Sequence, residues 1–273
     1  MMRRWLLALC SISGAACAHS QESSERACTT VPVPIEGRYR DGKVMVRASP
    51  VENSNASQWE YFYETGVRAM VETRTPNEGT TFTVYYPNGE TRLDGTYHVI
   101  IAEGAIALQP HGEWQLFNDD GSPLAHALFS NGVLLSREQW DKFGASVPWS
   151  LPDTVFEFRQ VHALFAASPV YPRESERLGR EATTCTLVCV DHEGKLRALF
   201  ALNEAPKDFE RAARNAIKSS IYVPQAIGEV SVPVCAPSKV VFRTKDLGDP
   251  KVTITYNDWV EGLKDVRKKI ERQ

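Results

Sequence analysis

Hydrophobic and polar residues alternate most regularly in the last third of the chain. Two apolar runs, residues 185–190 and 196–202, flank a glycine-containing turn at residues 191–194, and this arrangement predicts a β-hairpin. From Phe209 onward, apolar residues recur at the spacing of one helical face, which predicts an amphipathic helix over residues 205–218.

A third strand is predicted after this helix, over residues 230–243, with prolines in its middle. The order strand, strand, helix, strand predicts a small sheet with one helix on one face, a stable two-layer unit. A last amphipathic helix is predicted beyond residue 257, where an apolar stripe recurs at helical spacing. We expect this stripe to pack on the protein's own surface, with a partner's groove as the alternative. The stripe consists of Trp259, Leu263, Val266 and Ile270.

An aromatic residue and a glycine stand seven positions apart three times in the first half of the chain, at residues 59–66, 82–89 and 114–121. An alternating run follows each glycine, so each copy predicts a hairpin that must stack on its neighbours to bury one face. We expect the rings to form the core between the repeats, although they could instead line a binding surface for carbohydrate or peptide.

The segment between these two regions is predicted to be a connector. Residues 136–139 read as a capping box that opens a short helix ending at Gly144. Taken together, the patterns predict an α+β fold class: an N-terminal antiparallel β-hairpin repeat domain, then a small β-β-α-β domain with a C-terminal amphipathic helix.

Residues 169–244 resemble the C-terminal domain of TonB-type energy transducers. The resemblance rests on P-x-Y-P at residues 169–172, the hairpin turn at 191–194, D-F-x-x-A-A-x-x-A at residues 208–216 and the strand-to-proline step at Pro224. It implies a domain that binds another envelope protein and a link to TonB-dependent transport. True transducers of this kind carry a membrane helix and a long proline-rich spacer, neither of which is expected here, so the resemblance favours an adaptor.

The aromatic and glycine spacing over residues 59–135 resembles the MORN-type (YwqK-like) repeat, with its W-x-x-Y-x-x-x-G core. Such repeats serve as binding and scaffolding modules. The expected organisation is therefore a signal peptide (1–18), a MORN-like β-repeat domain (28–135), a connector (136–168), a TonB C-terminal-like domain (169–244) and a C-terminal extension with a helix (245–273).

The N-terminus has the features of an export signal. Arg3 and Arg4 precede a short apolar core, and small residues follow at 13–18. Cleavage at Ala-Cys-Ala would release a soluble protein, whereas a lipoprotein signal would place an acyl chain on Cys17. We expect a protein of a Gram-negative bacterium that is periplasmic, or that is membrane-anchored and faces the periplasm, touching the membrane only through this lipid.

Cysteine usage agrees with export. Cys185 and Cys189 lie four positions apart on one predicted strand, roughly 13 Å from each other, which is too far for a disulfide. Cys235 on the third strand is the natural partner of one of them, and the other pairs with Cys28 or stays a buried thiol. The same distance argues against a zinc site built from these cysteines and His192.

Composition and motifs exclude several classes of function. The formal net charge is −3 and no basic stripe with interleaved aromatic residues occurs, so nucleic-acid binding is not expected. No nucleophile-elbow, zinc-protease or nucleotide-binding motif is present. We therefore expect no catalytic residue, no metal site and no cofactor.

The expected function is that of an exported, non-enzymatic protein–protein interaction module whose partner adds a strand to an open sheet edge. The alternative is a ligand-binding or enzymatic protein with its site between the two domains. The sequence does not indicate the oligomeric state. The residues expected to form the interaction surface are Val230, Val232, Val240, Phe242, Tyr171, Trp59 and Trp114.

Overall fold

The computed structural model describes residues 33–75, 79–102 and 105–244. The predicted signal segment, Cys17, Cys28 and the predicted C-terminal helix lie outside the described residues. Within the described part, no helix has the length and apolar character needed to cross a bilayer.

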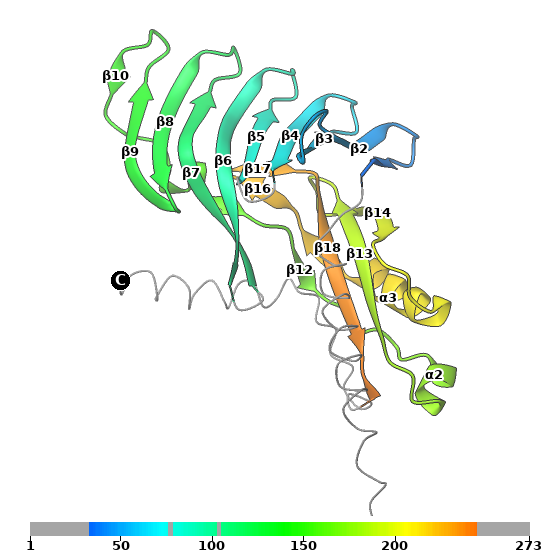
Figure 1. Ribbon diagram of the computed structural model, residues 1–273. Helices are drawn as coiled ribbons and strands as arrows, with labels where there is room; N and C mark the ends of the chain where they lie inside the picture. Colours follow the sequence, from blue (N-terminus) through cyan, green and yellow to red (C-terminus); the bar gives the residue numbers. More distant parts are fainter. Residues whose placement is uncertain (1–32, 76–78, 103–104, 245–273) are drawn as a thin grey trace, which may run out of the picture.

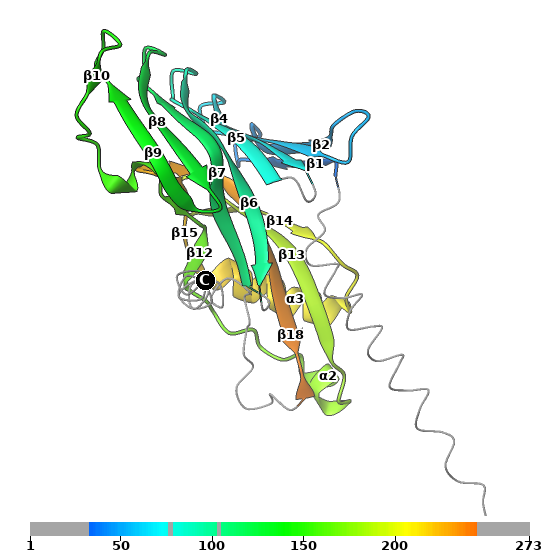
Figure 2. The ribbon, with the colours of Figure 1, turned by 60° about the vertical axis from the view of Figure 1, so that its left-hand side comes forward.

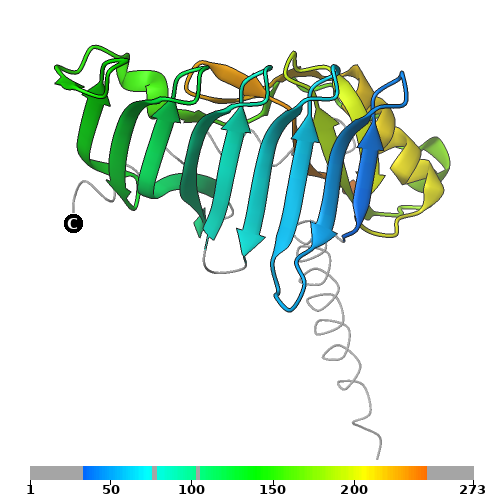
Figure 3. The same ribbon diagram turned by 90° about the horizontal axis from the view of Figure 1, so that it is seen from above.

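The first half of the chain folds into one ten-stranded antiparallel sheet in which every strand pairs with its neighbour in sequence (Figure 1). Seen from above, the strands follow one another side by side along the whole length of the molecule (Figure 3). They are β1 (Ile35–Arg38), β2 (Val44–Pro50), β3 (Ser57–Phe62), β4 (Arg68–Thr75), β5 (Gly79–Tyr85), β6 (Thr91–Ala102), β7 (Ala105–Phe117), β8 (Pro123–Ser130), β9 (Val133–Trp140) and β10 (Ser146–Val147).

The repeated glycines close the turns of this sheet. Gly66, Gly89 and Gly121 have φ values of 91°, 93° and 82°, a region that glycine reaches without steric cost. The aromatic residue of each repeat lies on the inner face: Trp59 and Trp114 are almost completely buried. The repeats are therefore not separate stacked hairpins, because each hairpin also pairs with the next and the sheet is continuous.

The second half of the chain forms smaller sheets beneath the large one (Figure 2). β13 is the central strand of a three-stranded sheet with the order β14-β13-β18, and β14 follows it through the turn at residues 191–194. The elements are η1 (Asp153–Phe156), β11 (Phe158–Arg159), β12 (His162–Phe165), α2 (Arg173–Arg177), β13 (Ala182–Val190), β14 (Leu196–Ala201), α3 (Lys207–Ser219), β15 (Ile221–Val223), β16 (Gln225–Ile227), β17 (Val230–Val232) and β18 (Val234–Phe242).

The predicted fold class, α+β, is wrong. The described residues are mostly β, with eighteen strands against two α-helices and one 3-10 helix. The predicted third strand is divided at Pro233 into β17 and β18, which belong to different sheets. The helix predicted over residues 136–144 is also absent, because residues 136–140 form the end of β9.

One hydrophobic core serves both halves of the chain. Trp59 and Trp114 from the large sheet share it with Leu187, Ile227 and Val232 from the second half. Outside this core, Arg197 of β14 donates hydrogen bonds to Asp191 in its own hairpin turn and to Glu64 in the turn after β3. The two halves are thus joined by apolar packing and by ion pairs.

Candidate functional site

The most unusual chemical feature of the molecule is an ion pair on the inner face of the large sheet. Glu72 and Arg74 lie two residues apart on β4, so their side chains project to the same face. The Arg74 guanidinium donates to the Glu72 carboxylate from Nε at 3.0 Å and from Nη2 at 2.6 Å. Glu72 is 1% exposed, so its charge depends on this arginine for neutralisation.

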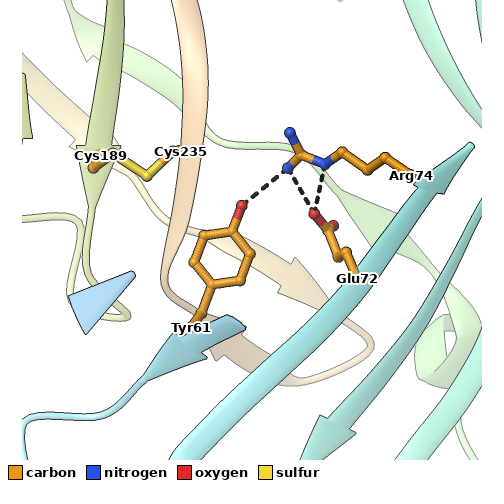
Figure 4. Close-up of a disulfide and its surroundings, with 5 residues drawn as sticks. All are labelled: Tyr61, Glu72, Arg74, Cys189 and Cys235. Carbon is orange, nitrogen blue, oxygen red and sulfur yellow. Dashed lines mark hydrogen bonds and ion pairs between the residues drawn. A yellow bond between two sulfur atoms is a disulfide. The ribbon is translucent and has the colours of Figure 1, made fainter. Parts of the chain in front are cut away.

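Aromatic side chains enclose the ion pair. Arg74 Nη2 also donates to the Tyr61 hydroxyl at 2.9 Å, and the Tyr97 hydroxyl donates to Glu72 Oε1 at 2.9 Å. The guanidinium carbon lies 4.1 Å from the centre of the Trp59 ring. Both carboxylate oxygens of Glu72 therefore accept hydrogen bonds. Figure 4 shows Tyr61, Glu72 and Arg74 beside the disulfide that joins Cys189 and Cys235.

Burial changes the acid–base behaviour of these groups. It raises the pKa of Tyr61 and of Tyr97 above the ordinary value, and the carboxylate of Glu72 adds to the effect in both. Burial alone would lower the pKa of Arg74, but Tyr61 and Glu72 outweigh it and raise that pKa. At neutral pH the two phenols of the cluster are thus neutral and the guanidinium is charged.

The raised tyrosine pKa values predict a loss of stability in alkali. Unfolded tyrosines ionise near pH 10, whereas the buried tyrosines of the folded protein stay neutral to higher pH. Above pH 10 the unfolded state therefore holds fewer protons than the folded state, and the free energy of unfolding falls as pH rises. Urea unfolding between pH 8 and 11 should show this fall.

The variant Tyr61→Phe should make that fall shallower above pH 10, since one ionising group is removed. A matched control is Tyr85→Phe, because the Tyr85 side chain is only half-buried. A pH dependence that is equally steep in Tyr61→Phe and in the wild type would contradict the prediction.

The disulfide in Figure 4 fixes the sheet beneath the ion pair. Cys189 of β13 and Cys235 of β18 lie directly opposite each other, with Cα atoms 4.0 Å apart. This confirms the expectation that Cys235 pairs with one of the two β13 cysteines. Cys185 is also disulfide-bonded, and Cys28, the partner considered from the sequence, lies outside the described residues.

The outer edge of β18 is a poor acceptor for an added strand near this disulfide. A Cα separation of 4.0 Å identifies Cys189 and Cys235 as a non-hydrogen-bonded pair, so the backbone groups of Cys235 and Pro237 point away from β13. Proline has no N–H to donate, so Pro237 lacks one of the donors that an added strand would use.

The edge of β9 offers a better acceptor. β10 pairs only with Gln139 and Trp140, and within the described residues no strand pairs with the outer side of residues 133–138. Three consecutive apolar side chains are exposed there, Val133 at 55%, Leu134 at 42% and Leu135 at 60%. A long, apolar, exposed edge strand is a template for pairing with another chain.

The C-terminal end of β9 is held in place by its neighbours. Arg137 donates to Asp153 at 2.6 Å and lies over the Trp149 ring. The amide of Gln139 donates to the Ser150 hydroxyl at 3.1 Å and accepts from the Ser150 backbone N–H at 2.8 Å. These contacts hold β9 in one position, so its edge loses less conformational entropy when a partner binds.

The structure places the predicted interaction residues elsewhere. All of them except half-buried Val230 lie in the core, so their side chains do not form a surface. The β9 edge was missed because residues 136–139 match a helix-capping pattern. The buried residues are Val232, Val240, Phe242, Tyr171, Trp59 and Trp114.

Comparison with known proteins adds little. No family model matches the chain, and no curated protein sequence matches it. Among solved structures, the chain is similar to the "Solution NMR structure of Pseudomonas aeruginosa TonB CTD", with 25% identity over 31% of this chain and 86% of that chain and a TM-score of 0.28.

Proposed function

We propose that this chain is an exported, non-enzymatic protein of a Gram-negative envelope that binds an extended segment of another envelope protein by β-strand addition. The observation that carries the proposal is the unpaired edge of β9 at residues 133–138, whose first three side chains are apolar and exposed. Main-chain hydrogen bonds to this edge would supply affinity, and the apolar side chains at 133–135 would favour a partner strand with apolar residues.

Two further observations support the proposed location. The export signal expected at residues 1–18 leads out of the cytoplasm, and the Cys189–Cys235 disulfide suits an oxidising compartment. The resemblance of residues 169–244 to TonB C-terminal domains suggests TonB-dependent transport as the setting, in which this protein acts as an adaptor.

The buried ion pair bears on the alternative of an enzyme. Glu72 has an acceptor role at both oxygens, and Arg74 bonds to Glu72 and Tyr61. A general base must lie within reach of a substrate proton, whereas Glu72 is 1% exposed and both of its oxygens already accept hydrogen bonds within the protein. We therefore assign the cluster a structural role in holding β3, β4 and β6 over the disulfide.

Strand addition predicts which changes weaken binding. Peptides selected for binding to the full-length protein should lose at least about tenfold in affinity, or about 1.4 kcal/mol, when Leu135→Lys places a charge on the edge. The control is Thr81→Lys, an exposed position on the interior strand β5. Affinities are measured by fluorescence anisotropy.

A second arm tests the main-chain contacts directly. Methylating alternate backbone nitrogens of a selected peptide removes its hydrogen-bond donors on one side, so one of the two methylated registers should fail to bind. If both registers bind as well as the parent peptide, or if Leu135→Lys binds like Thr81→Lys, strand addition at β9 is not the mode of binding.

A further inference from the structure

A second exposed apolar surface lies on the two-stranded sheet formed by β12 and β15, beneath the large sheet (Figure 2). Leu164 is 70% exposed, and Phe165 and Ile221 are each 56% exposed. Phe165 and Ile221 are directly opposite each other in the sheet. We call these three exposed apolar residues the β12/β15 patch.

A β-bulge creates this patch. Ala163 faces the core and is 7% exposed, so Phe165, two residues later, would face the core as well in a regular strand. The pairing shifts between Ala163 and Phe165, which leaves Leu164 as the extra residue and reverses the alternation. Phe165 is therefore turned outward by a local feature of the backbone.

We propose that the C-terminal segment of the same chain, residues 257–270, docks on the β12/β15 patch through its apolar stripe. The sequence predicts one helix face made of Trp259, Leu263, Val266 and Ile270. Such a face requires an apolar surface to cover it, and the patch is an apolar surface of matching character.

The segment is tethered to the described part of the same chain, and this also favours it over a free partner. The last described residue, Thr244, is held by two hydrogen bonds to Glu181, and residues 245–256 can span up to about 40 Å when extended. A tether of this length keeps the segment at an effective concentration in the millimolar range. This contact is independent of the β9 edge.

Photo-crosslinking in the full-length protein tests the proposal. With p-benzoylphenylalanine at position 165, we expect an intramolecular crosslink to residues 257–270, identified by peptide mass spectrometry. The matched control places the same group at Phe143, which is 83% exposed in the turn after β9 and should not react with this segment.

Two variants distinguish docking through the apolar stripe from crosslinking that results only from the segment being tethered nearby. Val266→Asp should lower the crosslink yield at least about tenfold, because it places a charge in the apolar contact. Lys268→Asp, on the opposite face of the predicted helix, should leave the yield unchanged. Equal yields in the two variants, no crosslink at position 165, or a crosslink between isotopically distinct copies of the chain would each overturn the proposal.

Discussion

Replacing Arg74 with methionine is expected to lower the free energy of unfolding by about 3 kcal/mol. The substitution leaves the Glu72 carboxylate buried without its counter-charge, while Tyr97 still donates one hydrogen bond to it. The value lies at the lower end of the usual range because the Arg74 side chain is 29% exposed, so water can reach the vacated space. Urea denaturation followed by circular dichroism measures the change.

A matched control lies on the same strand. Arg68 forms an ion pair with Glu60 at 2.9 Å, but its side chain is 48% exposed, so Arg68→Met should cost less than about 1 kcal/mol. The double variant Glu72→Met with Arg74→Met removes both charges and should be more stable than Arg74→Met alone. Equal losses of stability in Arg74→Met and Arg68→Met would show that the buried ion pair contributes no more to stability than the exposed one.

Removing the Cys189–Cys235 disulfide should cost about 4 kcal/mol, the value expected for a loop of this length in the chain-entropy model. The two cysteines are 46 residues apart, so the double variant Cys189→Ala with Cys235→Ala frees a long loop in the unfolded chain. Urea denaturation should show a lower midpoint and a steeper dependence on urea, since the unfolded state becomes more expanded.

The control for this variant is to verify that the other disulfide, at Cys185, is unchanged. Peptide mapping under non-reducing conditions must first show that Cys185 keeps the same partner as in the wild type. A loss of stability below about 1 kcal/mol, with an unchanged dependence on urea, would mean that the disulfide restrains a region that is already ordered in the unfolded state.

The local pattern of the sequence predicted elements better than it predicted their assembly. The hairpin around residues 191–194 and the helix from Phe209 are present as β13, β14 and α3, because alternation and helical spacing are local properties. The aromatic–glycine spacing also marked the turns of the large sheet. It did not show that neighbouring hairpins pair with each other, since pairing between repeats leaves no spacing of its own.

The ion pair could have been found from the alternation alone. Met70, Glu72 and Arg74 alternate along β4, so a buried Met70 implies that the other two side chains also face inward. Their partners could not be identified in this way. Tyr97 reaches Glu72 from β6, two strands away in the sheet, and only the register of the whole sheet brings them together.

The core common to Trp59, Trp114, Leu187 and Ile227 has a consequence for how this protein can change over time. A mutation in either half alters the packing of the other, so neither half is an autonomous module that recombination can transfer intact to another gene. The turns and strand edges are not bound by this constraint, and diversification of binding is expected to concentrate there.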